Sequence, residues 1–478
     1  MEDSKNQSNL GTEKIGRLLF SMACPAIIAQ IINVLYNLVD RMYIGHIENI
    51  GTAALTGVGV TFPLITLISA FSGLIGMGGA PQAAIKMGKG DNDSAEKILG
   101  TCTFALVVIS IILTAVILIF ERQILMLFGA SADTIKYAMD YMRIYCCGTI
   151  FIQLVLGLNP FITSQGFASI GMKTTVIGAV LNIILDPIFI WGFNLDVKGA
   201  ALATIISQAV SAVWVLKFLT GKKTILKIKK ENFGLDPKIL AVVLALGVSP
   251  FIMQSTESIL IVCFNTSLQR YGGDLAVGAM TILSSCMQFA MLPLTGLTQG
   301  AQPIISFNYG AGKKKRVMET FRLLMISSLT FTFLIWVMAV FIPQIFIGMF
   351  TDSSELMEVT KWALRIYMAT SLILGAQIAC QQTFIALGEA KISVFLAVLR
   401  KIILLIPLIF IFPAIIPESF AAAITPENIF GLIPEVTKTF SVFLAEPVAD
   451  IIAVLFTVIM FKLNYKKILS RIPDSATK

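Results

Sequence analysis

One apolar stretch of the chain, LNIILDPIF, carries side chains that could bind a small cation. Asn182 and Asp186 are four residues apart, so on a helix they lie one turn apart on the same face. Pro187 follows at once and cannot donate a backbone hydrogen bond, which frees a carbonyl about one turn earlier. Sodium needs several oxygen ligands, whereas a proton needs only one carboxylate, and these residues allow either. The alternative is that Asp186 only satisfies a neighbouring helix through hydrogen bonds.

Other charged residues also interrupt apolar stretches of the chain. If these stretches cross a membrane, a carboxylate near the bilayer centre costs at least about 2.5–3.5 kcal/mol, so it normally faces a cavity or a partner and marks a functional site. The further acidic candidates are Asp40 and, as secondary candidates, Glu257, Glu446 and Asp450. Their cationic counterparts are Arg143, Arg365, Arg400 and Lys401.

The polar segments lack the side chains of a catalytic site. His46 is the only histidine, and the chain contains no GxxxxGK[ST] loop for ATP. The seven cysteines lie in apolar segments without a CxxC spacing, which predicts neither a disulfide framework nor a metal site. We therefore expect a protein that is not an enzyme and needs no cofactor, ATP or metal other than a possible sodium ion at the cation site.

The composition indicates the elements that must position these residues. The 478 residues are 56% hydrophobic and 13% charged, whereas a soluble domain has about 25% charged residues. Apolar runs of roughly 20 residues predict an all-α integral membrane protein. The twelve expected spans lie near 16–39, 52–80, 95–120, 136–158, 168–193, 199–220, 238–267, 275–304, 318–347, 360–386, 391–414 and 438–463. The polar opening MEDSKNQSNLGTEKIG has no signal-peptide pattern, so we expect the first span to remain.

Basic residues gather in alternate loops and indicate the orientation in the membrane. They cluster in 86–97, 222–230, 313–316 and 462–471. The positive-inside rule places these segments and both termini in the cytoplasm, and the net charge of +8 then predicts no nucleic-acid partner. The loops that we expect outside are poor in Lys and Arg and contain Glu48, Asp133, Asp196, Asp274, Asp352 and the segment 417–435.

An internal repeat divides the chain almost in half. Pro81, Gly88 and Gly90 match Pro303, Gly310 and Gly312 at one constant offset of 222, which also pairs the two RIY motifs at 143–145 and 365–367. Two lobes of like topology are typical of transporters that rock around a central site. We expect a six-helix lobe at 1–220, a cytoplasmic linker at 221–237 and a second six-helix lobe at 238–478. The alternative is an ancient duplication in a protein that no longer moves.

Pro25 interrupts the first expected span, fifteen residues before Asp40. A proline inside a helix can act as a hinge, by which ion binding at the outer end is converted into bending. The alternative is a static kink, which is common in membrane helices.

The stretch YNLVDRMYIG, with the following IENIGTAALTGVGVTFPL, resembles the multidrug and toxic compound extrusion (MATE) family and its MepA-like bacterial branch. The resemblance implies twelve helices in two pseudo-symmetric lobes. It also implies that Asp40, Asn182, Asp186 and Thr204 bind the coupling ion. Exchange of that ion would drive export of bulky, often cationic and aromatic xenobiotics.

The chain departs from the family at one place. Another branch uses a Glu in span 7 and an Asp in span 10; Glu257 can stand for the first, but span 10 reads GAQIACQQTF and has no acid. This favours protons over sodium and the first lobe over the second. The resemblance also implies substrate-cavity residues: Gln153, Met287 and Gln288 each lie within a span of a lobe interior in the family's arrangement.

Two other functions compete with the antiporter. A lipid-linked saccharide flippase of the same superfamily usually has fourteen spans and a strongly cationic cavity, and an intramembrane enzyme needs a catalytic constellation. We therefore expect a multidrug antiporter of the bacterial cytoplasmic membrane, where the bilayer and small molecules are its partners and the protein is a monomer.

Overall fold

The computed structural model describes residues 9–48, 50–351, 353–416 and 437–471, and the regular elements in these ranges are all helices. Asp352 and the segment 417–435, which we assigned to outer loops, lie outside the described residues. Helices are the physical consequence of long apolar runs, because in lipid every backbone N–H and C=O must find its partner within the chain.

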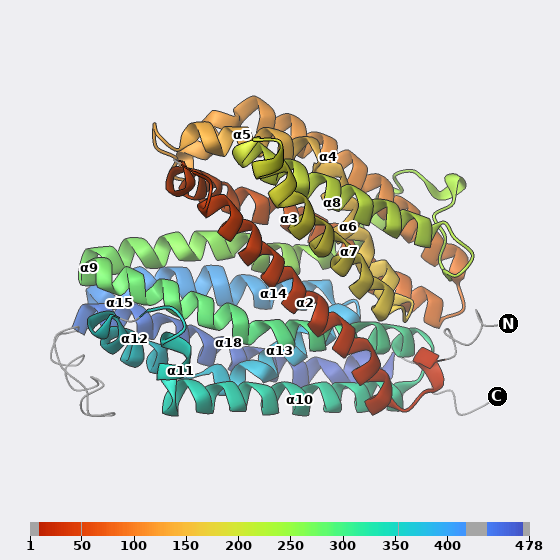
Figure 1. The fold of residues 1–478 in the computed structure, drawn as a ribbon. Coiled ribbons are helices and arrows are strands. Elements are labelled where there is room, and N and C mark those ends of the chain that lie inside the picture. The colour runs from red at the N-terminus through yellow and green to blue at the C-terminus, as the bar shows by residue number, and fades with distance from the viewer. Residues whose placement is uncertain (1–8, 49, 352, 417–436, 472–478) are drawn as a thin grey trace.

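The two halves of the chain form two layers of helices, which Figure 1 shows in red to yellow-green and in green to blue. The first half contains α2 Ile15–Gly45, α3 Gly51–Gly88, α4 Asn92–Leu127, α5 Ile135–Cys147, α6 Thr149–Ser164, α7 Ala168–Pro187, the π turn η1 Ile188–Gly192 and α8 Asp196–Leu219. The connection between the halves contains the short 3₁₀ helix η2 Lys230–Asn232. The second half contains α9 Pro237–Gly310, α10 Lys314–Phe341, α11 Pro343–Ile347, α12 Ser354–Tyr367, α13 Ser371–Ala386, α14 Ala390–Val398, the π turn η3 Leu399–Leu405, α15 Ile406–Ile415 and α18 Thr437–Ser470.

The long helix α9 contains two membrane spans. Its 74 residues would reach about 110 Å as one rod, far more than the roughly 30 Å hydrocarbon core of a bilayer. The chain turns back at Gly273, whose φ of 62° and ψ of −160° only glycine adopts without strain. Nine helices of the described residues are long and apolar enough to cross a membrane, and two bent pairs add two spans. With α9 counted twice, the predicted twelve spans are confirmed.

Two spans that we predicted as continuous are broken. The helices α5 and α6 meet at 59° around Gly148, and α12 and α13 meet at 47° around Thr370. Both breaks follow an RIY motif, and the two positions differ by the repeat offset of 222. The span predicted at 318–347 also ends early, at Phe341, because Pro343 cannot donate the backbone bond that would continue it.

Three hydrophobic clusters connect the helices. One cluster joins the two halves and includes Leu19 of α2 and Phe384 of α13. The other two each stay within one half, around Tyr141 in the first and Phe443 in the second. The two halves are therefore separate lobes, which converge on the side where α2 begins and α18 ends (Figure 1).

The connection between α8 and α9 packs against the first lobe. Gln165 Oε1 accepts hydrogen bonds from the backbone N–H groups of Ile225 at 2.8 Å and Leu226 at 2.9 Å. Lys229 forms an ion pair with the buried Glu96 of α4, at 2.5 Å. The assignment of 221–237 as a linker between separate units stays a prediction.

Candidate functional site

A buried polar cluster lies between α7 and α8 in the first lobe. The one-turn spacing places Asn182 beside Asp186, and Asn182 Nδ2 donates to Asp186 Oδ1 at 3.2 Å. The same amide also approaches Thr204 Oγ1 at 3.3 Å, and that hydroxyl in turn donates to the carbonyl of Ala200 at 3.1 Å. Asn182 thus bridges the two helices. The helix α7 gives way to the π turn η1 directly after Pro187, whereas the sequence predicts the freed carbonyl about one turn before the proline.

Asp40 of α2 completes this cluster. Its carboxyl group is within hydrogen-bonding reach of the carboxyl group of Asp186, although 146 residues separate them in the chain. Two tyrosines that the sequence analysis did not identify also lie here. Tyr36 is one turn before Asp40 on α2, and the Tyr141 hydroxyl of α5 reaches Thr204. The four residues that we predicted to lie together therefore do so.

The cluster is short of hydrogen-bond donors. Among the described residues, no donor reaches Asp40 Oδ1, Asn182 Oδ1 or Asp186 Oδ2, although all three oxygens are buried. Two carboxyl groups in contact can form a hydrogen bond only if one of them holds a proton. The oxygens of this cluster can therefore accommodate one additional positive charge.

Arg41 points away from its neighbour Asp40. Its guanidinium lies over the ring of Phe62, 4.3 Å from the ring centroid. Successive residues on a helix point about 100° apart, so the acid and the base cannot share one face. The positive charge of Arg41 is held by an aromatic ring at the outside of the cluster.

The second lobe holds a different cluster, in which acids and bases are paired. Arg400 Nε donates to Asp450 Oδ1 at 2.7 Å, and Arg400 Nη2 donates to Glu446 Oε1 at 3.2 Å. Lys401 Nζ donates to Glu257 Oε1 at 2.5 Å. The π turn η3 supplies both bases. All three secondary acids thus have a cationic partner, in contrast to Asp40 and Asp186 of the first lobe.

The two remaining cationic candidates, Arg143 and Arg365, lie on the helices that precede the breaks in the two bent spans. Arg143 Nε donates to the buried Glu121 Oε2 of α4 at 2.9 Å. Its repeat equivalent Arg365 donates from Nε to the carbonyl of Val340 at 2.9 Å. Each arginine therefore ties the helix before a break to the preceding span.

The suggested cavity residues have different surroundings. Gln153 is fully buried: its Nε2 donates to the carbonyl of Ile68 at 2.8 Å, and its Oε1 accepts from Ser72 at 2.9 Å. In this structure it packs α6 against α3. Met287 is half-buried and Gln288 is exposed on α9. Pro25 lies inside α2, which continues on both sides of it.

Twelve spans in two lobes, with charged side chains buried inside them, are the architecture of a membrane transporter. The chain belongs to the MatE family, whose profile matches residues 25–188 and 250–411. One matched segment falls in each lobe.

Known proteins resemble this chain over nearly its whole length. It is 24% identical over 397 residues to a protein of Staphylococcus haemolyticus named multidrug export protein MepA, with 83% of this chain and 87% of the relative covered. A solved structure of the MATE multidrug transporter DinF-BH in complex with rhodamine 6G is 31% identical, with a TM-score of 0.84 and coverage of 95% and 97%. An outward-facing MATE family transporter of the MOP superfamily is similar in fold, with a TM-score of 0.85 at 20% identity and coverage of 96% and 98%.

Proposed function

We propose that this protein is a cation-coupled multidrug antiporter. It exports bulky, often cationic aromatic compounds in exchange for an ion that enters through the cluster of Asp40, Asn182, Asp186 and Thr204. The name multidrug export protein belongs to the staphylococcal relative, and rhodamine 6G was bound to DinF-BH. We extend both to this chain because the family match includes both lobes.

The observation that carries the proposal is the shortage of donors around two buried carboxyl groups. Buried charges without partners are costly, so binding of one cation changes the free energy of this cluster strongly. Asp40 comes from α2, whereas Asn182 and Asp186 come from α7. Ion binding would thus draw α2 toward α7, and ion release would weaken the contact between these two helices. Such a difference between loaded and empty states is what coupling requires.

We prefer the proton as the coupling ion. One proton between Asp40 and Asp186 would complete their hydrogen bond, and it needs no further ligand. A second ion site in the other lobe is not favoured, because Glu257 already pairs with Lys401 and span 10 supplies only glutamines. Sodium is the alternative, since the cluster also offers the oxygens of Asn182 and Thr204.

Alternating access would use the convergence of the two lobes. The cluster shared by both lobes closes the side that holds the termini, while each lobe keeps its own core toward the other side. We infer that this arrangement is open to the outside of the bacterial cytoplasmic membrane, with both termini in the cytoplasm. The basic segments 313–316 and 462–471 favour that orientation.

The flippase alternative finds little support in the second lobe. A pocket for a diphosphate needs free cations, whereas the buried Arg400 and Lys401 are both bound to carboxylates. We therefore keep drug export as the proposed function.

The test is dye transport by the purified full-length chain in proteoliposomes. Rhodamine 6G efflux should follow an imposed pH gradient, and Asp40→Asn should abolish it while the protein stays folded and inserted. Asp133→Asn makes the same change at an exposed loop residue and should transport normally. Undiminished efflux by Asp40→Asn would remove this residue from the mechanism, and efflux under a sodium gradient alone would overturn the preference for protons.

A further inference from the structure

The second lobe has a groove on its outer surface, between α10 and α18. Its volume is about 520 Å³, and Cys380 of α13 lies between the two helices that form its walls. Ile326 of α10 is 51% exposed and Leu463 of α18 is 69% exposed beside it. Because apolar side chains of a transmembrane lobe that are exposed in this way face lipid, the groove opens toward the bilayer. We propose that it binds one anionic phospholipid.

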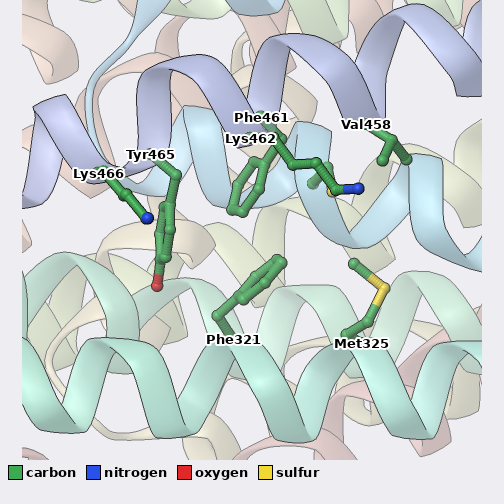
Figure 2. A pocket seen from close by; sticks show the side chains of 8 residues that line it. Phe321, Met325, Val458, Phe461, Lys462, Tyr465 and Lys466 are labelled. Atoms are coloured by element: carbon green, nitrogen blue, oxygen red, sulfur yellow. The ribbon is translucent and has the colours of Figure 1, made fainter.

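An aromatic wall makes the groove suitable for an acyl chain. The rings of Phe321 and Phe461 stack with centroids 4.4 Å apart, and the rings of Phe461 and Tyr465 stack at 4.5 Å. Figure 2 shows these rings between the two helices, with Met325 and Val458 farther along the same groove. Stacked rings lose little freedom when a chain binds, so they offer a preformed apolar surface.

Two lysines supply the charge that selects the headgroup. Lys462 and Lys466 are one turn apart on α18, and both line the groove (Figure 2). Both are exposed, and neither belongs to an ion pair within the described part of the chain. Figure 2 shows the ammonium group of Lys466 beside Tyr465, whereas the side chain of Lys462 runs along the groove toward Val458. The positive charges of the two lysines are complementary to a lipid headgroup whose phosphodiester is negative and which carries no positive group of its own.

A third polar group needs a partner at the same place. Tyr465 Oη is buried, and no described residue forms a hydrogen bond with it. Figure 2 shows the hydroxyl directed from α18 toward α10, across the groove. A phosphate or glycerol ester oxygen between the two helices would accept its hydrogen. The groove therefore combines apolar walls, two cations and one free donor, as a single phospholipid molecule requires.

The position of the groove along α10 and α18 corresponds to one leaflet of the bilayer. Phe321 and Met325 follow the basic segment 313–316, and Lys466 lies within the last turns of α18. In the orientation that we propose above, this end is cytoplasmic, and the inner leaflet is where anionic lipids attract lysines. The binding itself does not depend on transport, so its failure and the failure of drug export are distinguishable.

Native mass spectrometry of the full-length protein in detergent tests the site. With phosphatidylglycerol added, we expect one tightly retained lipid, and phosphatidylcholine with the same chains should bind at least tenfold more weakly. The double variant Lys462→Gln/Lys466→Gln should lose about thirtyfold in affinity for phosphatidylglycerol, the effect of two lysines at an anionic surface. Met325→Trp should weaken both lipids, because it fills the chain-binding part of the groove.

The matched control is Lys222→Gln/Lys223→Gln, which removes the same charge from exposed positions of the connection before α9. It should retain phosphatidylglycerol like the unchanged protein. Equal loss in both double variants would reduce the effect to general charge and overturn the site. Equal retention of phosphatidylcholine would overturn it too, and so would inorganic phosphate displacing the lipid at millimolar concentration, since that would mark a free-anion site.

Discussion

Gly88 of α3 and Gly310 of α9 pack reciprocally against each other's helices. A Cβ atom on Gly88 would overlap the carbonyl oxygen of Phe307, and one on Gly310 would overlap that of Ile85. Both pairs differ by the repeat offset of 222, so a twofold relationship joins the lobes through backbone contact. Small residues allow membrane helices to approach this closely. The lobes are therefore held together at one end, and in the alternating access that we propose this end would have to separate.

Gly88→Val should wedge that contact open. We expect the cytoplasmic ends of the lobes to separate and dye export to fall at least tenfold, because the closed state would be lost. Electron paramagnetic resonance distances between spin labels at Lys89 and Lys313 would report the separation. Gly59→Val is the matched control, since the same helix has open space around Gly59. Unchanged distances in Gly88→Val would contradict the closing role of this contact.

Asp186→Asn should stop coupled transport as fully as Asp40→Asn does. The reason is that the two carboxyl groups share one hydrogen bond in our proposal, so neither acts alone. Glu257→Gln removes a carboxylate of the other lobe and should leave at least about a third of the export rate. If Glu257→Gln alone were damaging in the efflux assay, the coupling site would belong to the second lobe.

Asn182→Ala should change ion binding without removing a charge. It deletes the amide that bridges Asp186 and Thr204, and loss of a hydrogen bond to a charged group is worth about 1.5–3 kcal/mol, or roughly 10-fold to 150-fold in ion affinity. Because the lost hydrogen bond favours the ionised carboxylate, proton binding should become stronger, and the pH dependence of efflux should shift to higher pH. Asn159→Ala removes a similar amide of the same lobe, which donates to the carbonyl of Gly171 at 3.3 Å, and should leave the pH profile unchanged. A shift in both variants would indicate a general packing effect.

Arg400→Gln should destabilise the second lobe. It leaves Glu446 and Asp450 buried without their cation, and breaking a buried pair in this way costs about 3–5 kcal/mol. Unfolding in detergent, followed by circular dichroism, measures the change. The triple variant Arg400→Gln/Glu446→Gln/Asp450→Asn should recover most of the loss.

The control for this prediction is an exposed ion pair. Arg17→Gln breaks the exposed ion pair with Glu13 and should lower the free energy of unfolding by less than about 1 kcal/mol. A triple variant that is as unstable as the single Arg400→Gln would show that packing of the arginine, and not its charge, holds the helices.

Features that repeat or run along the chain were predictable from sequence. The constant offset between Pro81 and Pro303 predicted the two lobes, and the spacing of Asn182 and Asp186 predicted one shared helix face. The breaks at Gly148 and Thr370 were missed, because a run of apolar residues has the same sequence pattern whether the helix is straight or bent. Their equal spacing from the RIY motifs is a signal that could have located them.

Contacts between distant segments were predicted only where a resemblance supplied them. The resemblance placed Asp40 and Thr204 with Asn182 and Asp186. Tyr141 was missed, because no feature of its own segment indicates a contact with α8. The contacts of Gln153 with α3 were not predicted, because the sequence of α6 does not indicate which face of the helix meets its neighbour. The pairing of Arg400 with Asp450 also depends on a lateral contact between helices, which local periodicity does not encode.

The connection before α9 limits how the two lobes can move. Gln165 holds it at Ile225 and Leu226, and the ring of Phe233 packs edge-on against Phe104 of α4, with centroids 5.1 Å apart. Only residues 234–236 then separate this anchored stretch from the first residue of α9. So short a tether keeps the start of α9 beside the first lobe. In the alternating access that we propose, this point would serve as the pivot, and the far end of the turning lobe would move most.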